Sequence, residues 1–238
     1  MSRLLLLSNS TNPGTPYLEW ARDRIASFLT GERELLFVPW ASVRIGWDEY
    51  TDRVAAALRP AGLNVHGIHR VSNAMAAVQS AEVIVIGGGN TFQLLRHIQD
   101  EGLIGPIRER VAAGAPYIGW SAGSNVACPT IRTTNDMPIV EPAGFRGLAL
   151  VPFQINPHYT DATIPNHGGE TRRERLAEFV DANPGVWVAG LREGALIEVQ
   201  GEHVRLGGDH PVTIFGGRGA PVEHGPGADL DFLMLPPA

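Results

Sequence analysis

The sequence predicts an α/β fold, a three-layer sandwich with a mostly parallel central sheet, followed by C-terminal antiparallel hairpins. Two observations predict it. In the first half of the chain, short apolar runs alternate with segments whose apolar residues recur at helical spacing. In the second half, shorter alternating runs surround glycine-rich turns. Because strand–helix–strand units connect parallel strands through right-handed crossovers, we expect helices on both faces of the sheet.

The first half contains expected strands separated by helices. The apolar runs that predict the strands cover residues 4–7, 35–38, 65–68, 83–86 and 116–120. The segments with helical spacing cover residues 18–28, 47–58, 74–78, 91–98 and 104–113. Pro60 and Gly62 end the second of these helices. The run at 83–86 has the strongest strand character and leads directly into three glycines.

The second half differs in pattern. Apolar runs predict buried strands over 148–155 and 186–189, and an amphipathic pattern predicts a helix over 172–183 between them. Further along, alternating runs predict antiparallel hairpins at one edge of the sheet. These runs cover residues 195–200, 203–206 and 212–215. The tail from Gly216 is rich in glycine and proline and has no pattern that assigns it.

Composition restricts the class of protein. The 238 residues are 44% apolar and 18% charged, which predicts one globular domain over residues 1–238. A chain of this length buries about 70% of the surface that it exposes when unfolded, so its stability needs neither a disulfide nor a metal. The single cysteine, Cys128, excludes an internal disulfide framework. It indicates a reducing compartment, and we expect the cytoplasm.

Charge and hydropathy restrict the partners. The formal net charge is −6 and the basic residues are scattered, so nucleic acid is not an expected partner. The longest apolar runs have about four to six residues, whereas a membrane-spanning helix needs about 20, so we expect no membrane association. No histidine pair has metal-ligand spacing with carboxylate support, and we expect no metal and no cofactor. A homodimer is compatible with such a fold, although no apolar stripe demonstrates it.

The pattern Gly-x-Ser-x-Gly at residues 119–123 lies after an expected strand and before a helical segment. The two glycines allow backbone atoms to approach closely in a sharp strand-to-helix turn. Such a turn presents the Ser121 hydroxyl at the start of the next helix, where free N–H groups favour developing negative charge. The pentapeptide alone is common, but in this context it predicts that Ser121 is a nucleophile.

A second glycine-rich loop, residues 87–90, follows the strand expected at 83–86. Its backbone N–H groups, at Gly88 and Gly89, can approach a substrate oxygen, and the N–H of Ala122 supplies a second donor. Asn90 ends the loop and is a further candidate for substrate binding. A tight turn or a phosphate cradle is the alternative, but the loop lacks the spacing of a dinucleotide-binding motif and the lysine of a P-loop.

A serine nucleophile needs a general base. Among eight histidines, His158 is the best candidate because it follows a strand end. The acid that orients this imidazole has two candidates: Asp136 in a polar loop, and Glu193 after the strand expected at 186–189. Either carboxylate can hold the required tautomer, and the residues alone do not choose between them.

Five motifs together resemble the peptidase E family, the aspartyl dipeptidases among the S51 serine peptidases. They are GGGNT at 87–91, GWSAG at 119–123, TNDMP at 134–138, NPHY at 156–159 and GETR at 169–172. The resemblance extends from the first strand to about Phe215 and implies a fold like that of class I glutamine amidotransferases, with serine in place of cysteine. It also implies cytoplasmic, metal-independent hydrolysis of dipeptides with an N-terminal aspartate.

The resemblance also implies roles for individual residues. The family's serine and histidine match Ser121 and His158, and residues matching both Asp136 and Glu193 have been considered as the third member of the triad. An aspartyl side chain in the substrate needs a cation, and Arg172 can bind a carboxylate with two parallel hydrogen bonds. The alternative interpretation is that Arg172 is a solvated arginine on the surface.

Other functions are compatible with the same motifs. The enzymatic alternatives are a cyanophycinase-like S51 peptidase that acts on β-aspartyl bonds, and an esterase that uses the same turn. A non-enzymatic alternative is an anion-binding domain that uses the loop at 87–89.

Overall fold

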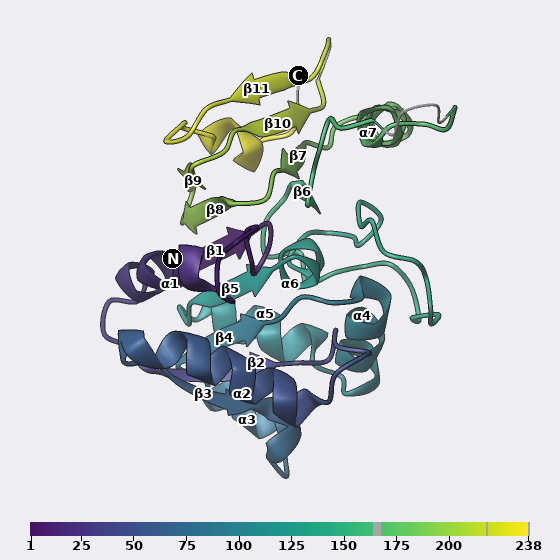
Figure 1. Ribbon diagram of the computed structural model, residues 1–238. Coiled ribbons are helices and arrows are strands. Elements are labelled where there is room, and N and C mark those ends of the chain that lie inside the picture. The colour runs from purple at the N-terminus through teal and green to yellow at the C-terminus, as the bar shows by residue number, and fades with distance from the viewer. Residues whose placement is uncertain (164–167, 218, 238) are drawn as a thin grey trace.

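In the part of the chain that this computed structural model describes, residues 1–163, 168–217 and 219–237, a seven-stranded sheet has the order β3-β2-β4-β5-β1-β8-β9 (Figure 1). Its strands are β1 (Arg3–Leu7), β2 (Glu34–Val38), β3 (Asn64–Gly67), β4 (Val83–Ile86), β5 (Tyr117–Trp120), β8 (Ala195–Gln200) and β9 (His203–Gly208). The first five pair in parallel, whereas β8 is antiparallel to both β1 and β9.

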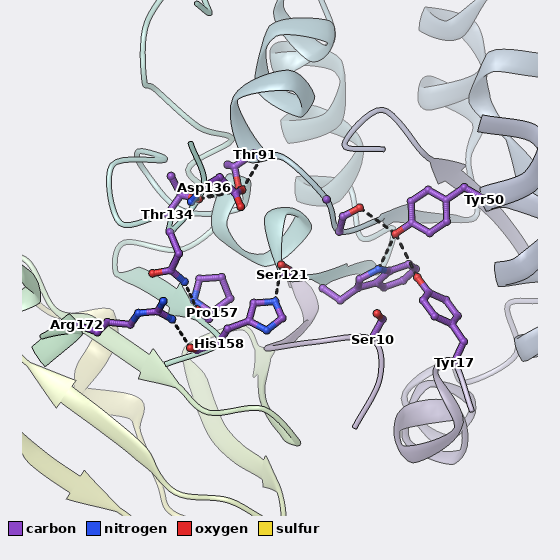
Figure 2. A pocket seen from close by; sticks show the side chains of 14 residues that line it. Ser10, Tyr17, Tyr50, Thr91, Ser121, Thr134, Asp136, Pro157, His158 and Arg172 are labelled. Carbon is purple, nitrogen blue, oxygen red and sulfur yellow. Dashed lines mark hydrogen bonds between the residues drawn. The ribbon is translucent and has the colours of Figure 1, made fainter. Parts of the chain in front are cut away.

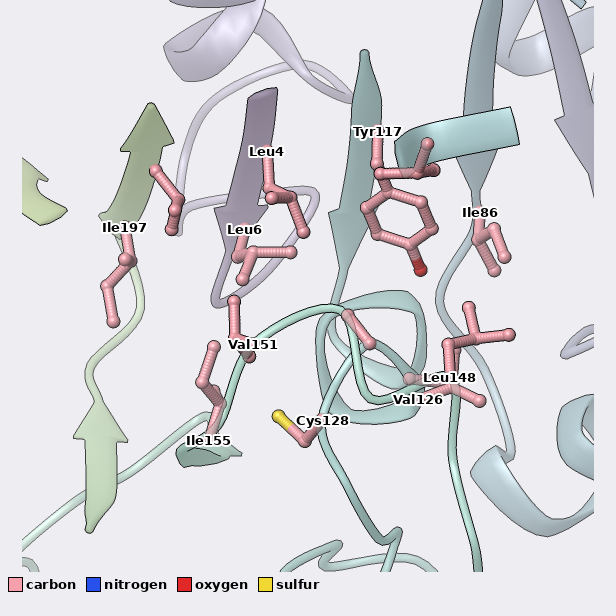
Figure 3. Close-up of a cluster of buried hydrophobic side chains, with 14 of the residues drawn as sticks. Leu4, Leu6, Ile86, Tyr117, Val126, Cys128, Leu148, Val151, Ile155 and Ile197 are labelled. Atoms are coloured by element: carbon pink, nitrogen blue, oxygen red, sulfur yellow. The ribbon is translucent and has the colours of Figure 1, made fainter. Parts of the chain in front are cut away.

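Helices cover both faces of this sheet. The leucines of β1 show this, since they alternate between two buried clusters. Leu5 and Leu7 pack with residues of α1 (Glu19–Phe28) and α2 (Trp47–Leu58). Leu4 and Leu6 pack on the other face, part of which Figure 3 shows. The helices on that face are α3 (Ala74–Ser80), α4 (Thr91–Asp100), α5 (Ile104–Ala112) and α6 (Ala122–Val126). The expected three layers are therefore present.

A smaller, four-stranded sheet in the same described ranges has the order β11-β10-β7-β6. Its strands are β6 (Gln154–Pro157), β7 (Val188–Leu191), β10 (Val212–Phe215) and β11 (Val222–His224). Strands β6 and β7 are parallel, and the other pairs are antiparallel. Helix α7 (Arg172–Ala182) packs on this sheet through Leu176, beside Val188 and Phe215. In Figure 1 this sheet and α7 lie beyond the end of the first sheet that β8 and β9 form.

Two expectations for the second half were wrong. The apolar run at 148–155 is a strand only from Gln154 onward. Its earlier part is irregular and only partly buried, since Leu148, Val151 and Phe153 are buried whereas Ala149 and Pro152 are exposed. Its backbone binds the end of α6 through two hydrogen bonds, from Leu148 N–H to Val126 O and from Leu150 N–H to Ala127 O. The run at 212–215 does not join the hairpin β8–β9 at the edge of the first sheet, because it pairs with β7 and β11 in the smaller sheet.

The remaining differences are small. Strand β7 begins two residues later than expected, and the unassigned tail contains β11 and a short 3-10 helix, Asp231–Met234. Cys128 is fully buried, and burial raises the pKa of its thiol to about 12. Within residues 1–163, 168–217 and 219–237, we find no helix with the length and apolar character needed to cross a membrane.

Glycines allow β4, β5 and α6 to approach closely. A Cβ on Gly123, in α6, would lie 2.1 Å from the carbonyl oxygen of Ile86 at the end of β4. A Cβ on Gly119, in β5, would lie 2.6 Å from the backbone of Gly123. Any side chain at either position therefore forces the turn between β5 and α6 away from the sheet.

We predict that Gly123→Ala lowers the free energy of unfolding by about 1–3 kcal/mol, because backbone must move to admit the methyl group. Gly105→Ala is the matched control, since a Cβ there meets no atom within 4 Å and lies on an exposed turn of α5. Alanine at this control position should raise the free energy of unfolding by up to about 1 kcal/mol. Urea unfolding of both variants measures the two changes, and equal midpoints would contradict the packing described for Gly123.

Candidate active site

The carboxyl ends of β1, β4 and β5 lie at one edge of the first sheet, where open parallel sheets bind ligands. A cleft of about 460 Å³ lies at this edge, a volume in the range of small-molecule sites. Figure 2 shows Ser121 in its centre, with Asp136 and Arg172 toward one end and Tyr17 and Tyr50 toward the other. The cleft is thus charged at one end and aromatic at the other.

Ser121 occupies a tight turn between β5 and α6. Its backbone has φ 52° and ψ −113°, a left-handed region that residues with side chains rarely adopt. Its N–H donates to the carbonyl of Leu7, at 3.1 Å, so the turn is attached to the neighbouring strand β1. The hydroxyl consequently points into the cleft, as the Gly-x-Ser-x-Gly pattern predicts.

Ser121, His158 and Glu193 form a chain of polar contacts. The Ser121 Oγ lies 2.8 Å from Nε2 of His158, and Nδ1 of His158 lies 2.7 Å from Oε1 of Glu193. Because a carboxylate only accepts hydrogen bonds, the contact with Glu193 assigns the proton of a neutral imidazole to Nδ1. The lone pair on Nε2 then faces the serine hydroxyl, the arrangement in which the imidazole can act as a base.

The backbone of His158 is held on both sides. It has φ 54°, and its N–H donates to the buried Ser8 hydroxyl at 2.9 Å. The same hydroxyl donates to the carbonyl of Leu191, at 2.7 Å. On the other side, Nη1 of Arg172 donates to the His158 carbonyl (Figure 2). The imidazole is therefore oriented by contacts to β1, β7 and α7.

Asp136 lies apart from this chain. Its Oδ2 accepts hydrogen bonds from the N–H and hydroxyl of Thr91, at 2.7 and 2.6 Å, and from the Thr134 hydroxyl at 3.1 Å. Thr91 is the first residue of α4, so the carboxylate lies at the positive end of this helix. The structure thus brings Glu193 to His158, and brings Asp136 to the wall of the cleft.

Both expected N–H donors are without an acceptor in the part of the protein that the structure describes. Within the described residues, neither the N–H of Gly89 nor that of Ala122 donates to a protein acceptor. Gly88 and Gly89 line the cleft together with Ser121. Gly89 has φ +137°, and a Cβ there would lie 2.2 Å from the Ala41 carbonyl oxygen. One of these N–H groups follows β4 and the other directly follows Ser121.

Asn90 has a different position from the other loop residues. Its side-chain oxygen accepts from the N–H of Gln93, which caps α4, and its amide nitrogen donates to the Met137 carbonyl at 2.8 Å. It does not line the cleft. The side chain therefore connects α4 to the loop that carries Asp136.

Arg172 is half-buried at the charged end of the cleft. Burial, and then the nearby charge of Arg175, lower its pKa from the ordinary value. Among the residues that the structure describes, no carboxylate forms a salt bridge with it. Arg173 and Arg175, by contrast, are exposed and each lies within 4.0 Å of a carboxylate oxygen. Arg172 is thus the arginine of this helix whose charge is available to the cleft.

Sequence reasoning missed two residues that shape the site. Ser8 directly follows β1. Because ligands bind beyond the carboxyl ends of parallel strands, this position could have identified it. Tyr50 lies on the buried face of α2, within the helix expected at 47–58, and nothing in the local pattern indicates that its hydroxyl binds the Gly88 carbonyl. Residues 1–163, 168–217 and 219–237 contain no cluster of three or more histidine, cysteine or acidic side chains that could hold a metal ion.

Comparisons with known proteins agree with the motifs. The sequence profile of peptidase family S51 matches residues 4–207. Peptidase E of Salmonella newport strain SL254 is 54% identical to the chain over 212 residues, which is 89% of this chain and 93% of that protein. The alignment with this relative covers most of both sequences.

Solved structures share the fold. A crystal structure of a peptidase from an acI-B1 Actinobacterium has a TM-score of 0.69 at 16% identity and covers 97% of this chain and 96% of its own. A structure from Listeria monocytogenes EGD-e has a TM-score of 0.66 at 24% identity and covers 87% and 98%. The α/β fold like that of class I glutamine amidotransferases is thus confirmed. Together with the profile match and the Salmonella relative, these findings establish that the chain belongs to peptidase family S51 and is a serine-type peptidase.

Proposed function

We propose that this peptidase hydrolyses dipeptides with an N-terminal aspartate, Asp-Xaa, through an acyl-enzyme on Ser121. The observation that carries the proposal is the chain of contacts from Ser121 through His158 to Glu193, in a cleft that also contains an arginine without a carboxylate partner among the described residues. The 54% identity to peptidase E supports the same activity.

In the proposed mechanism, His158 accepts the proton of Ser121 as the hydroxyl attacks the peptide carbonyl. The N–H groups of Gly89 and Ala122 bind the oxygen that becomes negative, a contribution of about 3–4 kcal/mol for each donor. His158 then protonates the departing amine, which leaves an aspartyl-enzyme. Water, deprotonated by the same imidazole, hydrolyses this ester. Glu193 accepts from Nδ1 throughout and stabilises the imidazolium.

The charged end of the cleft supports recognition of the aspartyl residue. A dipeptide with an N-terminal aspartate carries a side-chain carboxylate and an α-ammonium group close to the scissile carbonyl. Arg172 binds the carboxylate in this proposal, and Asp136 accepts hydrogen bonds from the ammonium group. The hydrogen bonds that Thr91 and Thr134 donate to Asp136 keep its carboxylate oriented for this second role.

We predict that the wild-type enzyme cleaves Asp-Leu faster than Ala-Leu, β-Asp-Arg or p-nitrophenyl acetate. Ser121→Ala should lower kcat on Asp-Leu by at least about a thousandfold, because the nucleophile is lost while the fold is kept. Steady-state assays on the four substrates, with circular dichroism as a folding control, measure this. Preference for β-Asp-Arg would indicate a β-aspartyl peptidase, preference for the acetate an esterase, and near-normal turnover by the serine variant would reject the mechanism.

We predict that Glu193→Gln and Asp136→Asn have different effects. Without Glu193 the imidazole loses its orienting carboxylate, so kcat should fall by about a hundredfold or more. Without the charge of Asp136, KM for Asp-Leu should rise more than kcat falls. Labelling of Ser121 by a fluorophosphonate separates the two roles, because it needs the base but no ammonium group. Slow labelling of Asp136→Asn and normal labelling of Glu193→Gln would reverse the assignment.

We predict that Arg172→Ala lowers kcat/KM on Asp-Leu by about ten- to a hundredfold, the usual effect of losing a hydrogen bond to a charged group. Its effect on Ala-Leu should be small, because that substrate has no side-chain carboxylate. Arg175→Ala, an exposed arginine of the same helix, is the matched control and should behave like the wild type. An equal loss on both dipeptides would mean that Arg172 only holds the His158 carbonyl.

A further inference from the structure

The hydroxyl of Tyr50 connects the two loops that carry the catalytic groups. It lies 3.1 Å from the carbonyl oxygen of Gly88 and 3.0 Å from Nε1 of Trp120, the residue before the nucleophile. The hydroxyl of Tyr17 lies 3.2 Å away. The ring of Tyr50 is buried against Phe37, with centroids 5.1 Å apart. Figure 2 shows the three hydrogen bonds meeting at this one oxygen.

The chemistry of the partners determines the direction of each hydrogen bond. An indole nitrogen only donates and a carbonyl oxygen only accepts. Tyr50 must therefore accept from Trp120 and donate its single proton to Gly88, and Tyr17 must donate to the remaining lone pair. Burial raises the pKa of Tyr50, which keeps the proton on the phenol at neutral pH.

The glycine loop needs an external constraint on its peptide planes. Close packing requires glycine at its positions, since a Cβ on Gly87 would lie 2.6 Å from the Tyr50 hydroxyl and one on Gly89 2.2 Å from Ala41 O. Glycine, however, leaves φ and ψ free, so the peptide between Gly88 and Gly89 can rotate at low cost. In a planar trans peptide the carbonyl of one residue and the N–H of the next point in opposite directions. Fixing the Gly88 carbonyl therefore fixes the direction of the Gly89 N–H.

We propose that Tyr50 is a positioning residue of this peptidase. Its hydroxyl holds the Gly88 carbonyl on the buried side of the loop, so that the N–H of Gly89 faces the substrate oxygen. Its hydrogen bond from Trp120 ties the same loop to the turn that carries Ser121. The inference rests on the proposed function, in which Gly89 is an oxyanion donor, and it names the residue on which that donor depends.

Tyr50→Phe tests the proposal with little change in packing, because it removes only the oxygen. Loss of a complete oxyanion donor typically lowers kcat by about 10²–10³-fold, and a donor that is still present but no longer fixed should cost less. We expect kcat on Asp-Leu to fall by about ten- to a hundredfold with KM within about threefold of the wild type. Fluorophosphonate labelling of Ser121 should slow by a similar factor, because the phosphoryl oxygen uses the same donors.

Tyr117→Phe is the matched control. The Tyr117 hydroxyl is also buried and donates to a glycine carbonyl, that of Gly123 at 2.6 Å, but among the described residues it forms no hydrogen bond with the loop at 87–89. This variant should lose comparable stability in urea while kcat stays within about threefold of the wild type. Incorporation of 4-aminophenylalanine at position 50 restores an N–H donor on the same ring and should recover most of the lost labelling rate.

The results separate this inference from the proposed function. If wild-type Ser121 is labelled and Tyr50→Phe is labelled as fast, the positioning role is rejected while the proposed mechanism stands. An equal loss of kcat in Tyr117→Phe would also reject the positioning role. So would a rise in KM without a fall in kcat in Tyr50→Phe, or a 4-aminophenylalanine variant that does not recover the labelling rate. Because the fluorophosphonate contains no aspartyl group, this measurement holds whichever dipeptide the enzyme prefers. An unlabelled wild-type Ser121 would overturn both.

Discussion

The contact between Ser121 and His158 joins two sheets, and the proposed mechanism depends on it. The serine follows β5 of the larger sheet and the histidine follows β6 of the smaller one, while Glu193 lies on the connection from β7 to β8 that links them. Ser8 reinforces this junction from β1, because its hydroxyl binds the backbone of both β7 and His158. The proposed mechanism therefore depends on the relative position of the sheets as much as on the side chains themselves.

The geometry of the site also depends on close packing of the backbone. The turn at Ser121 and the loop at 87–89 lie near one another only because glycines remove the Cβ atoms that would separate them. The resulting loops have little stiffness of their own. Neighbouring side chains supply it: Asn90 caps α4 and binds the Met137 carbonyl, and Tyr50 binds the Gly88 carbonyl. The site is thus a set of flexible backbone segments held by polar groups from elsewhere in the chain.

The first half of the fold could be predicted because its strands and helices follow from patterns among neighbouring residues. The apolar run at 83–86 and the helical patterns on either side of it are examples. The run at 148–155 was misleading, since apolar continuity indicates burial and says nothing about which backbone groups pair. Within the site, Ser121 and its glycines follow from the strand and helix around them. The partner of His158 does not, because it depends on how β6 and β7 pair. The partners of Tyr50 do not either, since they are 33, 38 and 70 residues away in the sequence.

The left-handed backbone at Ser121 and His158 has an evolutionary consequence. Each such residue costs of the order of 1–3 kcal/mol unless it is glycine, and the surrounding contacts must compensate. Glycine is the residue that the main chain prefers at both positions, yet it has neither hydroxyl nor imidazole. In the proposed mechanism, stability and hydrolysis therefore place opposite demands on these two residues. A lineage released from selection for hydrolysis would gain stability by replacing them with glycine.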